Sequence, residues 1–471
     1  MLRLFGQHKA PIATIFGVPL VVVVVDPGRE AAAQPVDKGP RNLVEGRAHT
    51  IGGKGNIQHH HTPGQAARPR QLARRCEEQR IEFVGPRADS IEIFGDKIAA
   101  KKLAEQMGVP TIPGYQGNDQ TTTKLLMECE RIGYPVIVKA AAGGGGRGLK
   151  VAMKRTEADA AIESAKREGL ASFGSDKVFL EKYLDQAKHI EVQVFGDASG
   201  RIYHLFDREC SIQRRHQKII EEATSPNLSE EMRMKLFECA IKLADKAKYR
   251  SAGTVEFLVQ GEQFYFMEMN TRLQVEHPVT ELVAGVDLVK SQLLTAAKRP
   301  VAFDQVTLSR RGHAIECRLY AEDAYKNGIP STGLLGHIEF PAGPNRRFEY
   351  GIEPGDEITS FYDSMIAKLV VWDETRPRAI QKMMRVIDDT IIFGVKTNLP
   401  FLREILRQSD FLDGKMTTGF INKYFSNGLV FQDSPDDKTV LEAADRGLRV
   451  AGAQSVPGKT LDPWSHQWGR S

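Results

Sequence analysis

Residues 268–281 read EMNTRLQVEHPVTE, and this stretch is the most informative part of the chain. Side chains on a strand alternate between its two faces, so an extended backbone would place every second residue on the same side. A half-buried strand with a solvated edge gives the same alternation, but it does not explain why carboxylates, amides and a guanidinium stand in one row. One face would carry Met269, Leu273 and Val275, and the other would carry Glu268, Asn270, Arg272, Gln274 and Glu276.

Residues 254–259 and 264–270 are predicted to form a hairpin around Gly261, and the second strand of this hairpin runs into the stretch 268–281. A three-residue turn centred on Glu262 would place Glu256 directly opposite Glu268, whereas a two-residue turn would not. Like charges opposite each other destabilise a sheet, so a cation should lie between these two carboxylates. Carboxylate and amide oxygens suit Mg²⁺. The pattern therefore predicts a metal site at Glu256, Glu268 and Asn270, and a solvated acidic edge is the alternative.

A glycine-rich run, GGGGRG at residues 143–148, lies between two predicted strands, 134–140 and 149–153. Consecutive glycines let backbone N–H groups approach phosphate oxygens closely. The run is not a Walker loop, because no Gly-Lys-Ser/Thr follows, and a strand after it argues against a dinucleotide fingerprint. With Lys139 close by on the first strand, we predict a flap over ATP. An ordinary flexible loop is the alternative.

The bulk composition describes a soluble multidomain protein. The chain has 471 residues, enough for two to four domains, and a formal charge of +4 that does not indicate nucleic acid as the main partner. Its 5 cysteines are far apart and form no CxxC or Cys/His ligand spacing, which argues against a zinc site. Scattered thiols fit a reducing cytoplasm better than a disulfide framework.

The N-terminal part differs from the rest in composition. Residues 10–25 are mostly apolar and resemble a secretory signal, but Pro11 and Pro19 interrupt them and they are short for a membrane span. We favour buried strands here, with 21–25 as a core strand. Residues 26–75 lack hydrophobic periodicity and are predicted to be loop or disordered.

Regular structure is predicted to resume near Gln71. A second αβ region begins at His313, and periodicity is lost after Tyr424. Helices are predicted from hydrophobic spacing, with Asp287 as the N-cap of the last of them. The predicted helices are 96–107, 231–249 and 287–297, and the predicted strands are 80–85, 134–140, 149–153, 178–183, 189–195, 254–259, 264–270 and 363–372.

Several motifs in chain order together resemble the biotin carboxylase family. The resemblance runs from about residue 80 to residue 424, and the combination of motifs is highly specific. Its main parts are Lys139 with the glycine run, EKYL at 181–184, CSIQRRHQK at 210–218 and the stretch 268–281. Later parts agree with it, namely RGHAIECR at 311–318, YDSM at 362–365 and GVKTN at 394–398.

The resemblance implies roles for individual residues. Glu276 would be the base that deprotonates bicarbonate, and Arg347 would stabilise the biotin enolate. ATP would be bound by Lys97, Lys139, Gly143, Gly144, Gly145, Gly146, Gly148, Glu181, Leu184, His189, Gln213 and His216. The divalent cations would be held by Glu256, Glu268 and Asn270, and bicarbonate by Lys218, Arg272, Gln274 and Val275.

The implied reaction is the carboxylation of biotin with ATP, bicarbonate and Mg²⁺ or Mn²⁺. A carboxylate base makes bicarbonate a better nucleophile, and Arg272 would hold its geometry by a bidentate contact. Attack on the γ-phosphate builds charge that lysines and the cation offset. The resulting carboxyphosphate would break down to CO₂ and phosphate, and the phosphate would take the ureido proton of biotin.

Biotin would arrive on a separate protein. Lys154 follows Ala152-Met153, which is similar to a biotin-attachment motif, but the second methionine is missing and we interpret Lys154 as a strand end. The expected partners are a biotin carboxyl carrier protein and the carboxyltransferase subunit of an acyl-CoA carboxylase, such as the acetyl-CoA carboxylase of fatty acid biosynthesis. We expect a cytoplasmic homodimer that binds neither nucleic acid nor membrane.

The implied fold class is α/β: a central ATP-grasp domain with a mobile lid, followed by a C-terminal αβ biotin carboxylase domain. The Rossmann-like start of the family, lysine-isoleucine-leucine-isoleucine-alanine-asparagine-arginine-glycine, is missing, so the first region would be a degraded remnant. The alternatives are another ATP-grasp ligase, such as a carboxylase of a purine precursor, and an impaired remnant that binds only nucleotide or partner subunits. The expected parts are a divergent N-terminal region at 1–75, an ATP-grasp domain at 76–310 with its lid at about 115–185, a C-terminal domain at 311–425 and a tail at 426–471.

Overall fold

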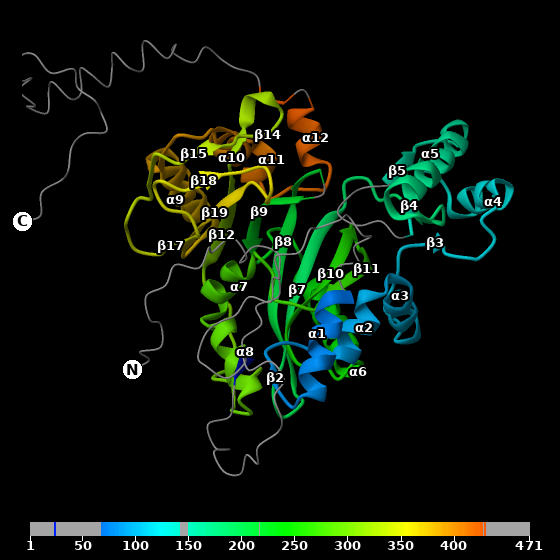
Figure 1. The fold of residues 1–471 in the computed structure, drawn as a ribbon, viewed down its shortest axis with the longest axis horizontal. Helices are drawn as coiled ribbons and strands as arrows, with labels where there is room; N and C mark the ends of the chain where they lie inside the picture. The colour runs from blue at the N-terminus through cyan, green and yellow to red at the C-terminus, as the bar shows by residue number, and fades with distance from the viewer. Residues whose placement is uncertain (1–22, 25–66, 142–148, 216, 427, 430–471) are drawn as a thin grey trace, which may run out of the picture.

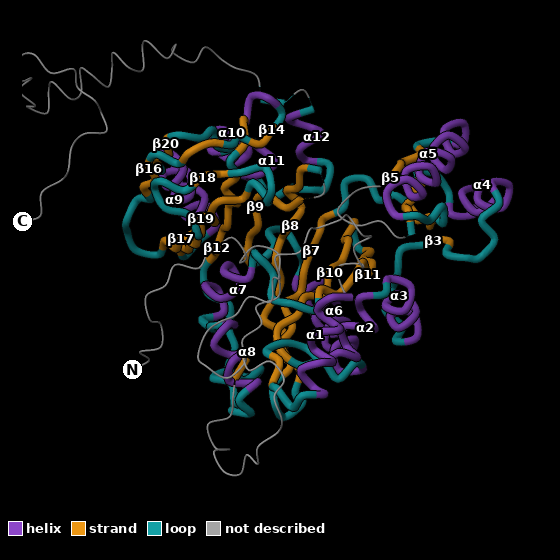
Figure 2. Tube along the Cα trace, in the orientation of Figure 1, coloured by secondary structure: helices purple, strands orange, loops and turns teal. Residues whose placement is uncertain are grey.

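The computed structural model describes residues 23–24, 67–141, 149–215, 217–426 and 428–429. Its centre is an eight-stranded sheet in which every neighbouring pair is antiparallel (Figures 1 and 2). The strands follow the order β11 (Gln263–Asn270), β10 (Ser251–Gln260), β7 (Lys188–Gly196), β8 (Ile202–Arg214), β9 (Gln217–Ala223), β12 (His313–Tyr320), β19 (Met365–Asp373) and β17 (Arg346–Tyr350).

Helices cover both faces of this sheet. Hydrophobic side chains on alternate positions of β12 and β19 pack against α9 (Arg376–Asp389) on one face, and the intervening Ala314 and Val370 pack against α7 (His277–Ala284) on the other. On β7, Ile190, Val192 and Val194 share a core with α6 (Glu230–Lys246).

The alternation along the strands leaves a polar row on the α7 side of the sheet. Because successive side chains point to opposite faces, the residues between Ile190, Val192 and Val194 on β7 point away from α6. These residues are Glu191 and Gln193, and both are fully buried. The sheet therefore carries buried polar side chains where α7 covers it, and this is where the candidate site lies.

A second, smaller sheet stands apart from the central one in Figure 1. It has its own hydrophobic core, built around Val136, Val138, Ile162 and Leu180. The loop 142–148, which contains the glycine-rich run, lies outside the described residues. The sheet has the order β3 (Gly114–Tyr115), β6 (Val178–Lys182), β4 (Val136–Ala140) and β5 (Leu149–Ala152), and it packs with α4 (Thr122–Ile132) and α5 (Arg155–Phe173).

The remaining described elements are mostly short. Residues 67–75 were predicted to be loop or disordered, but they belong to a helix that continues to residue 78, so the prediction is wrong there. Val23 and Val24 form β1, which pairs with β2 (Glu82–Phe83); the rest of the strand expected at 21–25 lies outside the described residues. The other helices are α1 (Ala67–Glu78), α2 (Ala88–Gly95), α3 (Lys97–Gln106), α8 (Leu288–Ala296), η1 (Ala324–Lys326), α10 (Leu399–Arg407), α11 (Ser409–Leu412) and α12 (Phe420–Phe425). The other strands are β13 (Glu322–Asp323), β14 (Ile329–Pro330), β15 (Gly333–Leu334), β16 (His337–Glu339), β18 (Glu357–Ile358) and β20 (Ile391–Phe393).

The predicted helices are confirmed, one of them begins at its predicted cap, Asp287, and another is capped by Asp96. Asp96 accepts hydrogen bonds from the N–H groups of Ile98 at 2.8 Å and Ala99 at 3.1 Å, and Asp287 accepts one from Lys290 at 2.7 Å. Such a cap satisfies backbone N–H groups that the first helical turn leaves without a partner. Among the described residues, no helix combines the length and the apolar character needed to cross a membrane.

The strand predicted at 264–270 is confirmed, and the extended backbone that a shared face for 268–276 would need does not continue beyond Asn270. Strand β11 ends at Asn270, and residues 271–276 form a loop that leads into α7. The strict alternation of faces therefore stops there. Arg272 is exposed, whereas Gln274 and Glu276 turn inward and are buried.

Candidate active site

The β10–β11 hairpin places Glu256 directly opposite Glu268, as predicted, although its turn is not the predicted one. Gln260 pairs with Gln263, so the turn has two residues rather than three. The register then shifts between Glu256 and Phe257, where a bulge at Met267 adds one residue to β11. The bulge restores the pairing that the shorter turn would have lost.

A third glutamate extends the row across the sheet. Glu191 on β7 is the register partner of Glu256, and Arg208 on β8 is the register partner of Glu191. Neighbouring carboxylates on one face repel each other, so each needs a cation close by. Two cations meet that need, the fully buried Arg208 and the partly buried Lys218, and their contacts define the centre of the site.

Lys218 lies among three carboxylates. Its Nζ donates to Glu276 Oε1 at 2.7 Å and to Glu256 Oε1 at 3.2 Å, and it also contacts Glu191. Burial alone would lower the pKa of Lys218, but the three glutamates outweigh it and hold the pKa well above its ordinary value. The ammonium is therefore charged at neutral pH and balances the neighbouring glutamates.

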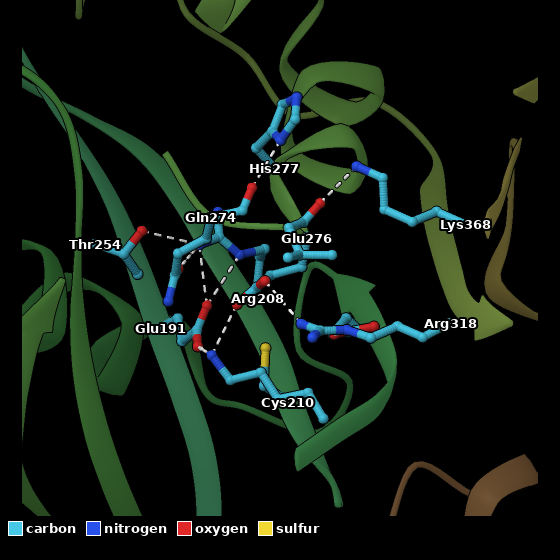
Figure 3. Close-up of polar contacts among 12 residues, drawn as sticks. Glu191, Arg208, Cys210, Thr254, Gln274, Glu276, His277, Arg318 and Lys368 are labelled. Carbon is cyan, nitrogen blue, oxygen red and sulfur yellow. Dashed lines mark hydrogen bonds and ion pairs between the residues drawn. The ribbon is translucent and has the colours of Figure 1, made fainter. Parts of the chain in front are cut away.

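Arg208 is fully buried and holds the polar face together (Figure 3). Its Nε and Nη2 donate to the same oxygen of Glu191 at 3.1 and 3.0 Å. The other acceptors are Gln193 at 2.7 Å, on the same strand as Glu191, and Thr254 at 3.0 Å, Gln274 at 2.7 Å and Thr280 at 3.0 Å from three further segments. One guanidinium thus ties β7, β10, the 271–276 loop and α7 to β8.

Glu276 lies between two cations at the start of α7. Its Oε1 accepts from Lys218, and its Oε2 accepts from Arg318 Nη2 at 2.9 Å. Burial would raise the pKa of Glu276, but Lys218, Arg318 and Arg208 outweigh it and hold the pKa well below its ordinary value. The carboxylate is therefore ionised, buried and fixed in position.

Glu256 is the most heavily bonded of the proposed metal ligands. It lies 2.9 Å from His189 Nε2 and accepts from Asn270 Nδ2 at 2.6 Å and from Gln274 Nε2 at 3.0 Å. Its partner Glu268 is partly exposed, and Lys97 Nζ lies 3.7 Å from its Oε2. The two strands thus present carboxylate and amide oxygens side by side at one end of the hairpin, and this donor set fits a hard divalent cation.

On the small sheet, Glu181 forms ion pairs with two lysines. Its carboxylate contacts Lys139 and lies 3.6 Å from Lys101 Nζ. Burial would raise the pKa of Glu181, but Lys139 and Lys101 outweigh it and lower the pKa. On the central sheet, Gln213 Nε2 lies 2.7 Å from His189 Nδ1 and donates to the Cys210 carbonyl at 2.8 Å.

Two families match consecutive parts of the chain. The one described as "Carbamoyl-phosphate synthase L chain, ATP binding domain" matches residues 96–302, and the one described as "Biotin carboxylase C-terminal domain" matches residues 316–423. Over 359 residues the chain is 46% identical to a pyruvate carboxylase subunit of Methanothermobacter thermautotrophicus, and the match covers 76% of this chain and 73% of the relative. The chain belongs to the biotin carboxylase family.

Other members of the biotin carboxylase family are longer than this chain. The mitochondrial alpha subunit of methylcrotonoyl-CoA carboxylase from Dictyostelium discoideum is 43% identical over 394 residues, which are 83% of this chain and 56% of the relative. The chain therefore spans about half the length of the first curated relatives it matches.

Solved structures of the family share the fold. The biotin carboxylase domain dimer of the Hydrogenobacter thermophilus 2-oxoglutarate carboxylase, in complex with MgADP, ADP and bicarbonate, is 42% identical with a TM-score of 0.73. The match covers 77% of this chain and 80% of that one. A biotin carboxylase from Campylobacter jejuni gives the same TM-score at 40% identity, over 77% of this chain and 81% of that one. The predicted α/β class with an ATP-grasp domain and a C-terminal biotin carboxylase domain is confirmed.

Of the biotin carboxylase residues predicted from sequence, some meet in this site, some lie on the small sheet or have other partners, and some lie outside the described residues. Lys218, Gln274 and Glu276 meet at its centre, and the Val275 carbonyl accepts from Lys368 at 2.8 Å. Leu184 is half-buried just beyond β6. Gly143, Gly144, Gly145, Gly146, Gly148 and His216 lie outside the described residues.

Two predicted arginines have other partners than the central carboxylates. Arg272 donates to the Leu273 carbonyl at 3.3 Å. Arg347 donates to Glu281 at 2.6 Å and also contacts Glu349. The arginine that contacts the predicted base is instead Arg318.

Sequence reasoning missed Glu191, Arg208 and Arg318, although two of them left a signal. Residues 188–196 (KHIEVQVFG) and 313–320 (HAIECRLY) both alternate polar and apolar side chains in the manner of 268–276. Residues 189–195 were predicted as a strand, and applying the same test of alternating faces to both stretches would have placed Glu191 and Arg318 on polar faces. Arg208 left no comparable signal, because its neighbours on β8 are a mixture of polar and apolar residues.

Proposed function

We propose that the chain catalyses the ATP- and bicarbonate-dependent carboxylation of biotin carried on a separate protein. The observation that carries the proposal is Glu276, a buried carboxylate held between Lys218 and Arg318 beside the paired oxygens of the β10–β11 hairpin. A base, anion-binding cations and a metal donor set in one place are what activation of bicarbonate toward a phosphoryl group needs. The solved relative that binds MgADP and bicarbonate supports this reading.

Nucleotide and metal roles follow the donor sets. We assign the cation to Glu256, Glu268 and Asn270, whose oxygens fit Mg²⁺ or Mn²⁺; when bound, it would offset charge on the transferring phosphate. Lys97 lies beside Glu268 on the central sheet and Lys139 lies beside Glu181 on the small sheet, and we propose that both lysines bind ATP phosphates. Glu181, Leu184, His189 and Gln213 would frame the nucleoside, with His216 and the glycine run 143–148 completing the pocket.

We propose that substrate binding releases the base. With its low pKa, Glu276 is a weak base while Lys218 and Arg318 both contact it. Bicarbonate held by Lys218, Arg272, Gln274 and the Val275 backbone would compete for the Lys218 ammonium. Drawing that cation off raises the basicity of Glu276 at the moment a proton is to be removed.

The contacts favour Arg318 over Arg347 as the cation that stabilises the biotin enolate. Arg318 Nη2 lies 2.9 Å from Glu276, so a substrate next to the base would also lie next to this guanidinium. Arg347 contacts Glu349, which contacts Lys368, and so reaches the site only through intermediates. Arg347 stays the candidate that the motif pattern predicts.

The first expected result is ATP hydrolysis that depends on bicarbonate and Mg²⁺ and is stimulated by free biotin. It follows from the base and the metal donor set lying together. Phosphate release would be measured with each component left out in turn. Equal hydrolysis with and without bicarbonate would contradict the proposal, and bicarbonate dependence without a biotin effect would favour another ATP-grasp ligase. Nucleotide binding without any turnover would favour an impaired remnant.

The second expected result concerns the metal ligand Glu268. Replacing Glu268 by glutamine should abolish turnover and leave the melting temperature of the free protein nearly unchanged, because the side chain is partly exposed and Lys97, at 3.7 Å, is its charged partner. Glutamine also removes repulsion with Glu256. The measurement is thermal melting without nucleotide, next to the turnover assay. A fall of many degrees would identify Glu268 as a structural carboxylate and overturn the metal assignment.

The place of the chain in a larger assembly is also a proposal. We propose that it acts with a biotin carboxyl carrier protein and a carboxyltransferase subunit in the first half-reaction of an acyl-CoA carboxylase, as a cytoplasmic homodimer. Relatives named as methylcrotonoyl-CoA and propionyl-CoA carboxylase subunits, and a biotin carboxylase domain solved as a dimer, support it. We further propose that residues 76–310 form the ATP-grasp domain, with the small sheet as a lid at about 115–185, and that residues 311–425 form the C-terminal domain.

A further inference from the structure

A second pair of buried glutamates lies beside the site. Glu221 on β9 and Glu316 on β12 are register partners, and both are 0% exposed. Among the described residues, neither oxygen of Glu316 has a hydrogen-bond partner, and neither does Oε2 of Glu221. Two ionised carboxylates placed this way would be strongly destabilising. One of them must therefore carry a proton or have its charge fully balanced.

The cations and acids around this pair come from each neighbouring element. Arg318 is on β12 with Glu316, Lys218 is on β9 with Glu221, and Lys368 is on the adjacent strand β19. Across the α7 side lie Glu276 and His277, and Glu349 on β17 contacts Lys368. Lys368 donates to the Val275 carbonyl and Lys218 is shared by three other glutamates, so in the described part of the chain neither hydrogen-bonds Glu316.

Arg318 connects the pair to the base. Its Nε donates to Glu221 Oε1 at 2.5 Å, and its Nη2 donates to Glu276 Oε2 at 2.9 Å. The guanidinium is planar and its N–H directions are fixed, so the bond at Nε sets where Nη2 points. Glu221 is thus the only carboxylate besides Glu276 that a described hydrogen bond joins to Arg318.

We propose that Glu221 is a positioning residue for the carboxylation reaction: its charge shares the Arg318 guanidinium with Glu276, and Glu316 is the protonated companion that lets this charge exist inside the sheet. The inference rests on the proposed function. When Glu221 is ionised, Arg318 is shared between two carboxylates. When Glu221 is protonated, Glu276 is the one ionised carboxylate that a described hydrogen bond joins to Arg318, and the undivided cation weakens it as a base.

The energetics of burial agree with this division of roles. Burial raises the pKa of Glu221 to about 7 even though Arg318 lowers it. Burial raises the pKa of Glu316 well above its ordinary value, and Lys368 only partly offsets it. Glu221 therefore changes charge near neutral pH while Glu316 stays protonated. Glu276 is ionised throughout this range, because its own pKa is well below the ordinary value.

The test is the pH profile of turnover in Glu221→Gln. In the natural chain, kcat should fall roughly tenfold as the pH drops through about 7, the scale expected for a weakened general base. Glutamine keeps an oxygen for Arg318 Nε but has no charge, so the variant should show the low rate at every pH and no inflection. Glu316→Gln should retain the inflection, and Glu221→Asp should restore part of the high-pH rate. The same change at Glu404, a partly exposed residue of α10 that pairs with Arg407, should alter nothing. An inflection near pH 7 that survives in Glu221→Gln would overturn the proposal.

Thermal melting provides a readout that does not need turnover. Because the folded pKa of Glu221 is raised from 4.5 to about 7, the stability it favours is fully present below pH 4.5 and is lost as the pH rises through about 7. Glu221→Gln has no group that titrates at this position, so it does not lose stability in this way. The melting temperature of the variant minus that of the natural chain should therefore increase by a few degrees between about pH 5 and about pH 8. A difference in melting temperature that stays constant with pH would contradict the proposal that Glu221 titrates beside a protonated Glu316. If the chain hydrolyses no ATP, the proposed function fails, and the melting comparison still decides whether Glu221 titrates.

Discussion

Replacing Glu276 by glutamine is expected to lower kcat for bicarbonate-dependent ATP hydrolysis by about 10²–10⁴-fold, the usual contribution of a general base. Glutamine has nearly the same shape but cannot take a proton. The loss should appear in kcat rather than in the KM for ATP. The described hydrogen bonds of Glu276 reach neither the small sheet nor the proposed metal ligands on β10 and β11, so ATP binding should change little. Initial rates over a range of ATP at saturating bicarbonate would measure both constants.

The control for this prediction is stability. Lys218 keeps Glu191 and Glu256 after the change, and Arg318 keeps Glu221, so neither cation is left without an anion. The melting temperature should therefore change far less than the rate. A variant that melts many degrees lower and loses activity in proportion would show that Glu276 holds the sheet to α7 and does not act as a base.

Replacing Arg208 by methionine is expected to destabilise the chain by about 3–5 kcal/mol, the cost of breaking a buried ion pair from one side. The change leaves the charge of Glu191 with Lys218 and the nearby His189, and it removes a donor from each of Gln193, Thr254, Gln274 and Thr280. Methionine fills part of the volume, so the loss measures charge and hydrogen bonds more than packing. Urea unfolding followed by circular dichroism would give the free energy of unfolding.

A matched change on the surface separates this effect from the loss of any arginine. Arg378 on α9 pairs with Glu374 at 2.6 Å, and both side chains are largely exposed. Arg378→Met should cost less than about 1 kcal/mol. Equal effects at the two positions would mean that the Arg208 network contributes no more than a surface ion pair, and the picture of a guanidinium that ties five segments together would be wrong.

Helices and strands could be predicted from sequence where the signals that determine them lie within one short segment. The helices at 96–107 and 287–297 have an aspartate at the cap and a hydrophobic face, and both are confirmed. The strand alternation on β11 is also confirmed as far as Asn270. Beyond that residue the pattern continued in the sequence but the strand did not, because Gln274 and Glu276 are drawn inward by Arg208, Lys218 and Arg318.

The centre of the site depends on partners that are far apart in the sequence. Lys218 joins glutamates at 191, 256 and 276, and Arg318 joins glutamates at 221 and 276. The strand order β11-β10-β7-β8-β9-β12-β19-β17 brings these residues together, and no local pattern encodes that order. Residue types alone therefore predicted the kind of chemistry but assigned no role to Arg318, because the role of this side chain depends on which carboxylates it contacts in the folded chain.

The bulge at Met267 has a consequence for how the hairpin tolerates change in length. The extra residue of β11, Met267, lies between the turn at Gly261 and the paired carboxylates Glu256 and Glu268. One residue more in the turn, with the bulge lost, would give the same pairing of the two carboxylates. Insertions at the hairpin tip and deletions at the bulge can thus compensate each other, and the tip is free to vary in evolution or to be redesigned for a new contact while the oxygens at the far end stay aligned.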